Sequence, residues 1–297
     1  MPTPPFGRLL TAMVTPLRPD GALDLDAAAA LAGYLVDELK NDGLVLSGTT
    51  GESPTTTDAE KAELLRVVLD AVGDRASVLS GVGTFSTAHT IELARQAADV
   101  GAHGLLVVTP YYSKPPQAGL LEHFRAVADA TDVPVMLYDI PGRAGVALGT
   151  QTLLRLAEHQ RIVAVKDAKG DLAATSAVIA ATDLAYYSGD DAMTLPLLSV
   201  GAVGVVGTST HFSGPGTKAM IEAYLAGDVA SALELHQRLL PIFTGVFATQ
   251  GCILVKAGLA LQGRPVGGLR SPLVAATADE TAALGASLAA AGLPAMA

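Results

Sequence analysis

The 297-residue sequence has no tryptophan, a single cysteine and few charged or aromatic side chains. Cys252 cannot form a disulfide within the chain, and we interpret it as a small buried hydrophobic residue. No apolar stretch reaches roughly 18 residues without Gly, Pro or charge, so no membrane span is expected. The first residues lack a charged start followed by an apolar run, so we expect no secretory signal and predict a cytoplasmic location.

Positive charge is also scarce. The 19 Lys and Arg residues are outnumbered by 29 Asp and Glu residues, which gives a formal net charge of −10 at pH 7. An acidic chain is repelled by phosphate backbones and by anionic lipids, so we expect neither nucleic acid nor a membrane as a partner. Half of the residues are hydrophobic, which is enough for a large buried core.

Short apolar runs alternate with stretches of helical periodicity along most of the chain. The runs at 9–14, 44–46, 78–82, 104–108, 133–138, 162–165, 184–187 and 203–206 have the length and composition of buried strands. Helical patterns lie between them, at 26–39, 58–72, 87–100, 119–130, 150–157, 172–180 and 191–200. Eight such repeats predict an α/β fold, a (β/α)8 TIM barrel. A doubly wound open sheet is the alternative, weakened by the count of eight and by the lack of a Gly-x-Gly-x-x-Gly turn after the first strand.

The periodicity changes after residue 226. Beyond that point only helical patterns follow, at 229–247, 254–261 and 279–291, separated by Gly and Pro. We therefore predict a barrel over residues 1–226 that carries the active site, and a C-terminal helical extension over 227–297 that packs on the barrel.

One apolar run leads directly into a lysine. Side chains alternate along a strand, so Ile162, Ala164 and Lys166 are predicted to share the inner face of the barrel, and Val163 and Val165 the outer face. Burial lowers the pKa of a lysine, and a neutral amine can attack a carbonyl to form a Schiff base. The simpler alternative is a strand-end lysine that reaches into solvent, unless other chemical groups converge on it.

Such groups follow several other strands, whose carboxyl ends meet at one mouth in a barrel. Lys169, beyond the strand end, is expected to be solvated. No His, Cys or carboxylate cluster with metal-ligand spacing appears there, so no metal is expected. The groups at the strand ends are Ser47-Gly48-Thr49-Thr50-Gly51-Glu52-Ser53, Thr109-Pro110-Tyr111-Tyr112, Tyr138-Asp139-Ile140-Pro141-Gly142-Arg143, Ser188-Gly189-Asp190-Asp191 and Gly207-Thr208-Ser209-Thr210.

Two of these stretches have side chains that a Schiff-base aldolase needs. The turn at 48–51 presents backbone N–H groups beside Thr49 and Thr50, which suits a carboxylate, although an ordinary helix-capping turn would look similar. Tyr138 could pass protons to and from a carbonyl oxygen, or it could be a structural buried tyrosine.

Three further side chains at this mouth also have two interpretations. Arg143 follows Pro and Gly in a loop that we expect to be exposed, where it could bind a carboxylate in bidentate fashion or form a surface salt bridge. Tyr111 and Tyr112 could be hydrophobic loop anchors or an interface pair.

Over nearly the whole chain, the motifs at 48–53, 109–112, 138–143, 166–168 and 188–191 occur in the order and spacing of a known family. In these motifs the sequence resembles the dihydrodipicolinate synthase / N-acetylneuraminate lyase family. The resemblance implies a lyase that condenses pyruvate with L-aspartate-4-semialdehyde to 4-hydroxy-tetrahydrodipicolinate, the first committed step of diaminopimelate and lysine biosynthesis. It implies no cofactor beyond a covalent imine on Lys166.

The resemblance also implies roles for individual residues. The catalytic residues would be Lys166, Tyr138, Thr50 and Tyr112, and the substrate-binding residues Thr49, Thr50, Arg143, Gly189 and Val206. Thr50, Tyr138 and Tyr112 would form a proton relay, with Tyr112 supplied by a neighbouring subunit of a homotetramer built from dimers. Thr49 and Thr50 would hold the pyruvate carboxylate, and Arg143 the carboxylate of aspartate semialdehyde.

Related activities in the same family are the main alternative. Lyases for N-acetylneuraminate resemble this chain at the lysine and the tyrosine, but they usually carry Ser-Thr in place of Thr49-Thr50 and lack Arg143. A 2-keto-3-deoxy sugar acid would be another second substrate. Gly207 and Thr208 depart from the family pattern and could alter the aldehyde that is used. A non-catalytic protein that binds small acids is a further alternative, which trapping with pyruvate and borohydride would exclude.

Family members regulated by lysine suggest one more expectation. They typically carry histidines where this chain has Asp58 and Lys61, and asparagine and glutamate where it has Phe85 and His89. The changes remove partners for an amino acid's ammonium group, so we predict that L-lysine does not inhibit this protein.

Overall fold

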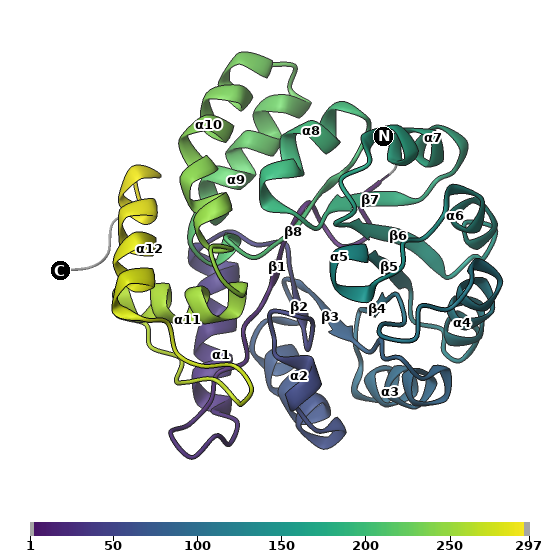
Figure 1. Ribbon diagram of the computed structural model, residues 1–297, viewed down its shortest axis with the longest axis horizontal. Helices are drawn as coiled ribbons and strands as arrows, with labels where there is room; N and C mark the ends of the chain where they lie inside the picture. Colours follow the sequence, from purple (N-terminus) through teal and green to yellow (C-terminus); the bar gives the residue numbers. More distant parts are fainter. Residues whose placement is uncertain (1–2, 294–297) are drawn as a thin grey trace.

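The computed structural model describes residues 3–293 and contains eight parallel strands closed into a barrel (Figure 1). Each strand pairs with the next along the chain, and β1 pairs with β8 to close the ring. The predicted TIM barrel is therefore confirmed, and each predicted strand boundary lies within two residues of the observed one. The strands are β1 Leu9–Ala12, β2 Gly43–Leu46, β3 Ser77–Gly81, β4 Gly104–Val108, β5 Val135–Asp139, β6 Ile162–Asp167, β7 Ala185–Ser188 and β8 Gly204–Gly207.

Helices surround the barrel on its outside. Asp24 caps the first of them, as a carboxylate does for free backbone N–H groups. Two helices were not predicted, α5 because it has only four residues, and α9 because Gly214 and Pro215 interrupt its pattern. The helices are α1 Leu25–Gly33 (continued as a π-helix, Tyr34–Glu38), α2 Asp58–Val72, α3 Thr87–Val100, α4 Gln117–Asp129, α5 Pro141–Ala144, α6 Thr150–Leu156, α7 Leu172–Ala181, α8 Thr194–Ser199 and α9 Thr210–Leu225.

The C-terminal part is helical, as predicted. It comprises α10 Val229–Gly245, α11 Gly251–Leu261 and α12 Ala278–Ala290. Helix α10 lies against α9, and α12 packs on both α10 and α11 (Figure 1). Cys252 is fully buried there, as expected. These helices share one apolar core with the barrel helices, and the boundary at residue 227 stays a prediction.

The inside of the barrel holds a separate apolar cluster, and β6 enters it irregularly. The pairing of β6 shifts register opposite the Val135–Met136 step. As a result Ile162 packs in the outer core, while Val163 packs against the inner cluster that contains Ala164. The predicted strict alternation is therefore wrong at the start of β6, because one unpaired residue reverses the facing of its neighbours. It holds from Ala164 to Lys166, the part that positions the amine.

Among residues 3–293, no helix is long and apolar enough to cross a membrane.

Candidate active site

A cavity of about 510 Å³ opens at the carboxyl ends of the strands. Of the eight residues to which the resemblance gives a role, four belong to its wall, namely Thr49, Tyr112, Tyr138 and Arg143. The other four, Thr50, Lys166, Gly189 and Val206, do not line it. Tyr138 connects the two groups, since its ring faces both the cavity and the amine of Lys166.

Lys166 lies near the end of β6, inside the barrel. Lys166 is only 5% exposed, and its Nζ lies 4.4 Å from the centre of the Tyr138 ring. Burial lowers the pKa of Lys166 to about 8, because a charged amine loses its hydration there; the opposing charge of Asp191 raises it, and Arg143 lowers it further. A substantial fraction of the amine is therefore neutral near physiological pH.

Tyr138 occupies the matching place on β5 and pairs with Lys166 in the sheet register. Burial raises the pKa of its phenol to about 12, although a hydrogen bond with Thr49 and the charge of Arg143 act in the opposite direction. The hydroxyl therefore stays protonated at neutral pH. When the neutral amine attacks a carbonyl carbon, a protonated phenol beside it can donate a proton to the carbonyl oxygen as that oxygen leaves.

The turn after β2 is held in one conformation by close contacts. Ser47 and Glu52, on either side of it, adopt left-handed backbone angles with φ of 52° and 56°. A Cβ on Gly51 would lie 3.0 Å from the backbone nitrogen of Ser47, a tight contact that favours glycine there. The hydroxyl of Thr15 donates to the carbonyl of Gly51 at 2.7 Å. Thr50 is buried at the centre of this turn.

Thr50 meets the end of β8, where the sequence departed from the family pattern. The hydroxyl oxygens of Thr50 and Thr208 lie 3.3 Å apart. The backbone N–H of Thr208 donates to the buried carboxylate of Asp191, as do the N–H and hydroxyl of Ser209. A Cβ on Gly207 would lie 2.7 Å from Asp191, so glycine lets this carboxylate approach. Sequence reasoning gave Asp191 no role, although its position next to Lys166 in the barrel gives it an effect on the amine's pKa.

Gly189 lies beside the stem of Lys166 and Val206 lies in the apolar cluster inside the barrel, and neither lines the cavity. A Cβ on Gly189 would lie 3.1 Å from Cγ of Lys166, so the missing side chain leaves space for the stem of the lysine. Val206 is fully buried in the apolar cluster inside the barrel, together with Tyr138. Both residues therefore shape the space around the reactive group.

The two tyrosines after β4 behave differently. The ring of Tyr111 packs edge-on against Phe85 with centroids 5.6 Å apart, so it is a loop anchor within this chain. Tyr112 has a left-handed φ of 72° and is 93% exposed. Arg143 is exposed too, but it lies on the short helix α5 and not in an irregular loop.

Lys169 does not lie in solvent, and the sequence prediction is wrong here. Its side chain is 13% exposed, and its Nζ lies 3.5 Å from the carboxylate of Asp139. Burial raises the pKa of Asp139 to about 6, and the nearby lysine opposes that shift. The ion pair takes the place of the water that a simple strand-end position would have given Lys169.

Sequence reasoning also missed part of the cavity wall. Gln250, Pro272 and Leu273 come from the C-terminal extension and line the cavity. Apolar periodicity shows which helices are buried, but it does not show which connecting segment reaches the barrel mouth, so the sequence carried no signal for these residues. Within the described part of the chain, no group of three or more His, Cys, Asp or Glu side chains could hold a metal ion.

Comparison with known proteins agrees with this geometry. Residues 5–291 match the model of the dihydrodipicolinate synthetase family. The chain is 70% identical to the 4-hydroxy-tetrahydrodipicolinate synthase of Acidothermus cellulolyticus over 97% of this chain and 93% of that protein. It is 63% identical to 4-hydroxy-tetrahydrodipicolinate synthase 2 of Streptomyces coelicolor over 98% and 97% of the two chains.

A solved structure has the same fold. It is that of DHDPS from Cyanidioschyzon merolae with lysine bound, with a TM-score of 0.96, 44% identity and coverage of 98% of this chain and 100% of that one. The strand-end motifs, the buried lysine and these full-length matches lead to one conclusion: this chain belongs to the dihydrodipicolinate synthetase family.

Proposed function

We infer that this chain is a lyase that condenses pyruvate with L-aspartate-4-semialdehyde to give 4-hydroxy-tetrahydrodipicolinate, the first committed step of diaminopimelate and lysine biosynthesis. The observation that carries this inference is the buried Lys166 amine beside Tyr138, in a chain 70% identical to a relative that bears the name of this activity. The reaction needs no bound cofactor, because the lysine itself activates the pyruvate.

In the first step, the neutral amine of Lys166 attacks the keto carbon of pyruvate. The nitrogen gives up two protons, the carbonyl oxygen leaves as water, and a C=N bond forms. The phenol of Tyr138 is protonated, with its pKa near 12, and it supplies a proton to the departing oxygen. The lowered pKa of Lys166 supports this step, since only the unprotonated amine is a nucleophile.

The second step joins the two substrates. Loss of a methyl proton from the imine gives an enamine, which attacks the aldehyde carbon of aspartate semialdehyde and forms a C–C bond. The amino group of that substrate then adds to the imine carbon and displaces Lys166, which closes the ring and restores the free enzyme. No external oxidant or reductant takes part.

Substrate binding is assigned to the residues around the cavity. Thr49 and Thr50 hold the pyruvate carboxylate, together with backbone N–H groups of their turn. Arg143, on the cavity wall, binds the carboxylate of aspartate semialdehyde. Gly189 leaves room for the stem of Lys166, and Val206 belongs to the apolar cluster that contains Tyr138, so both shape the surroundings in which the amine meets pyruvate.

The exposed Tyr112 supports an oligomer. It lies at the cavity wall, and it is 93% exposed within one chain. An exposed tyrosine at a site mouth is a typical interface residue. We propose that Tyr112 reaches into the site of a neighbouring subunit, where it completes a proton relay with Thr50 and Tyr138, in a homotetramer built from two dimers. The cytoplasmic location stays a prediction from the sequence.

A trapping experiment tests the activity. Pyruvate with borohydride should leave a reduced adduct on Lys166, read by mass spectrometry of peptides. Initial rates with pyruvate and a panel of aldehydes then decide the second substrate. A preference for N-acetylmannosamine or a sugar aldehyde over aspartate semialdehyde would assign the chain to a sister activity, and the absence of any adduct would exclude the whole mechanism.

A further inference from the structure

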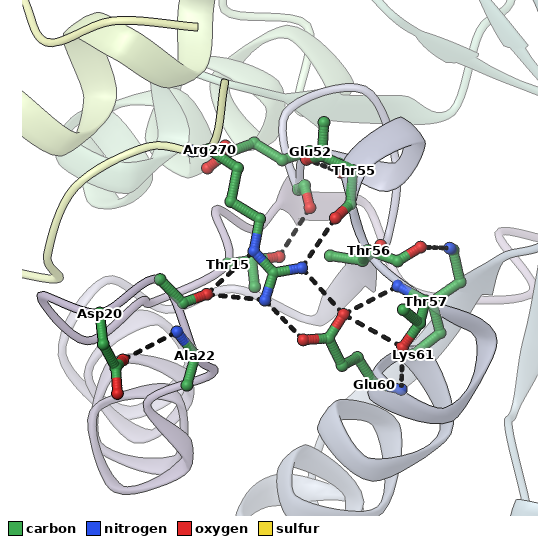
Figure 2. A network of polar contacts seen from close by, with 12 residues as sticks. Thr15, Asp20, Ala22, Glu52, Thr55, Thr56, Thr57, Glu60, Lys61 and Arg270 are labelled. Atoms are coloured by element: carbon green, nitrogen blue, oxygen red, sulfur yellow. Dashed lines mark hydrogen bonds and ion pairs between the residues drawn. The ribbon is translucent and has the colours of Figure 1, made fainter. Parts of the chain in front are cut away.

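Segments far apart in the sequence meet next to the turn that carries Thr49 and Thr50. Figure 2 shows Arg270, from the C-terminal extension, between the loop after β1 and the loop that runs from Glu52 into α2. The neighbouring Lys256 comes from α11. We call the connection between α11 and α12, residues 262–277, the C-terminal strap.

The first contact is a buried ion pair. The carboxylate of Glu52 accepts from Nζ of Lys256 at 2.7 Å and from the backbone N–H of Arg270 at 3.0 Å. Lys256 also donates to the carbonyl of Gly268, so the pair is bonded to the strap on both sides. The two charged side chains are only 4% and 1% exposed. Burying such a pair adds little stability, so its role is best sought in the geometry that it fixes.

The backbone of Glu52 has a conformation that is unfavourable for a residue with a side chain. Glu52 has a φ of 56°, in the left-handed region. A non-glycine residue stays there only when its surroundings hold it. The contacts with Lys256 and Arg270 do so, and Glu52 stands two residues after Thr50, in the same tight turn.

The second contact is the guanidinium of Arg270, whose five N–H groups all find acceptors. Two donate to the carbonyl of Gly21, one to the carbonyl of Thr55, and two to the carboxylate of Glu60. Glu60 also completes the capping box of α2 with Thr57. The fork therefore joins the loop after β1, the loop after β2 and the strap in one fixed arrangement (Figure 2). A lysine cannot reproduce it, because its donors are not arranged in a plane.

The strap continues directly into the cavity wall. Pro272 and Leu273, which follow Arg270, line the same cavity as Thr49. The strap therefore contacts the site in two places. It holds the turn that contains Thr49 and Thr50 through Glu52, and it forms part of the cavity wall through Pro272 and Leu273.

We propose that Lys256 and Arg270 are positioning residues of the reaction, which hold the Thr49–Thr50 turn in the position that binds the pyruvate carboxylate. This inference rests on the proposed binding of that carboxylate by the turn. Arg143, to which the aldehyde carboxylate is assigned, belongs to α5, and among residues 3–293 no hydrogen bond or ion pair joins its side chain to Glu52, Lys256 or Arg270. The strap reaches the cavity wall through Pro272 and Leu273 as well, so its main effect, through the turn, should fall on pyruvate.

The test compares two arginines of one strap. Arg270→Lys keeps the charge but breaks the fork. Arg264→Lys is the matched control, since Arg264 pairs with Glu38 and stacks on Tyr34, away from the turn. We expect Arg270→Lys to raise KM for pyruvate about tenfold or more, given that a misplacement of about 1 Å can cost about 100-fold. KM for aspartate semialdehyde should change less than about twofold, and both constants should stay unchanged in Arg264→Lys.

Three results would overturn the proposal: an unchanged KM for pyruvate in Arg270→Lys, an equal rise for both substrates, or the same rise in Arg264→Lys. If Arg270→Lys does not fold, Glu60→Gln decides, because it breaks part of the fork and should raise KM for pyruvate in the same selective way. An unchanged KM in that variant contradicts the proposal as well. The wild type must first form the borohydride-trapped adduct; its failure to do so would sink the proposed activity, whereas trapping with a normal KM in the variants sinks only the positioning role.

Discussion

The pH dependence of imine formation follows directly from the burial of Lys166. Its pKa falls from the ordinary 10.5 to about 8. At pH 7 the neutral fraction of the amine is then about a tenth, against about one part in 3,000 for an exposed lysine, a gain of about 300-fold. We expect the second-order rate of pyruvate trapping to rise about tenfold per pH unit below pH 7 and to level off above about pH 8.

The assay is the initial rate of borohydride-trapped adduct at low pyruvate between pH 6 and pH 10. Tyr138, with a pKa of about 12, stays protonated throughout this range, so the rise of the trapping rate with pH is due to the deprotonation of Lys166. Lys169→Met is the control variant, and it should still form the adduct with the same pH dependence of the trapping rate. A rate that continues to rise up to pH 10 would show that the amine is not desolvated, and an adduct on Lys169 would contradict the assignment.

The same pKa predicts a change in stability. A lysine whose folded pKa is lowered destabilises the fold wherever it is charged, so the penalty is complete below about pH 8 and disappears as the pH rises toward 10.5. The drop corresponds to about 3 kcal/mol. Lys166→Met should therefore be more stable than the wild type at pH 7, and urea unfolding should show that this difference shrinks between pH 8 and pH 10.5. A difference independent of pH would refute the reasoning.

Four further predictions concern other groups at the site. Arg143→Ala should lose about 2–4 kcal/mol of transition-state binding for aspartate semialdehyde, while trapping of pyruvate stays within a few-fold of wild type; equal losses would make Arg143 structural. Tyr112→Phe should slow turnover with an unchanged melting temperature, and sedimentation should show an oligomer; a fully active monomer would contradict the shared site. Thr208→Val should lower turnover by a factor that corresponds to about 1 kcal/mol, because Thr50 loses its hydroxyl partner, and Thr208→Ser should restore it. L-lysine at low millimolar concentration should leave the initial rate unchanged at saturating pyruvate, with calorimetry as a second measure of binding.

The expected insensitivity to lysine gains a physical reason from the structure. His89 and Asp58 lie 2.8 Å apart and pair with each other, so they satisfy their own polar groups. The amine of Lys61 is directed to the carbonyl of Thr56. Phe85 packs against Tyr111. A free amino acid would have to break such contacts to bind here. Inhibition at low millimolar lysine would contradict this reasoning, because it would mean that these contacts break at little cost.

The fold was predictable because each buried strand leaves its own mark. Short apolar runs, most of them rich in Val, Leu and Ile, gave all eight strands, since a parallel strand is covered on both faces. The start of β6 was not predictable in the same way. The bulge at Ile162 and Val163 depends on pairing with β5, and a run of β-branched residues looks the same with or without an unpaired residue.

The residues of the site also differ in how far the sequence could predict their positions. The placement of Tyr138 and Lys166 near strand ends, and of Thr49 in the turn after β2, could be predicted because strand ends meet at one mouth, whereas their chemical roles stay predictions. The ion pair of Lys169 and the contacts of Arg270 could not, because they depend on loop paths. Arg270 and Glu52 are separated by 218 residues, and no local pattern indicates that they meet.

The charges around Lys166 also bear on the order in which the substrates bind. In the free enzyme the positive charge of Arg143 helps to lower the pKa of Lys166, whereas the carboxylate of Asp191 raises it. Asp191 is held by hydrogen bonds from Thr208 and Ser209, which follow β8, so its contribution is constant, but that of Arg143 depends on what it binds. An aldehyde carboxylate bound to Arg143 before pyruvate would compensate its charge, raise the pKa of Lys166 and slow the attack on pyruvate. Once the imine has formed, the lysine nitrogen no longer has to act as an unprotonated nucleophile, and the same carboxylate can bind without that penalty. The electrostatics therefore favour pyruvate as the first substrate.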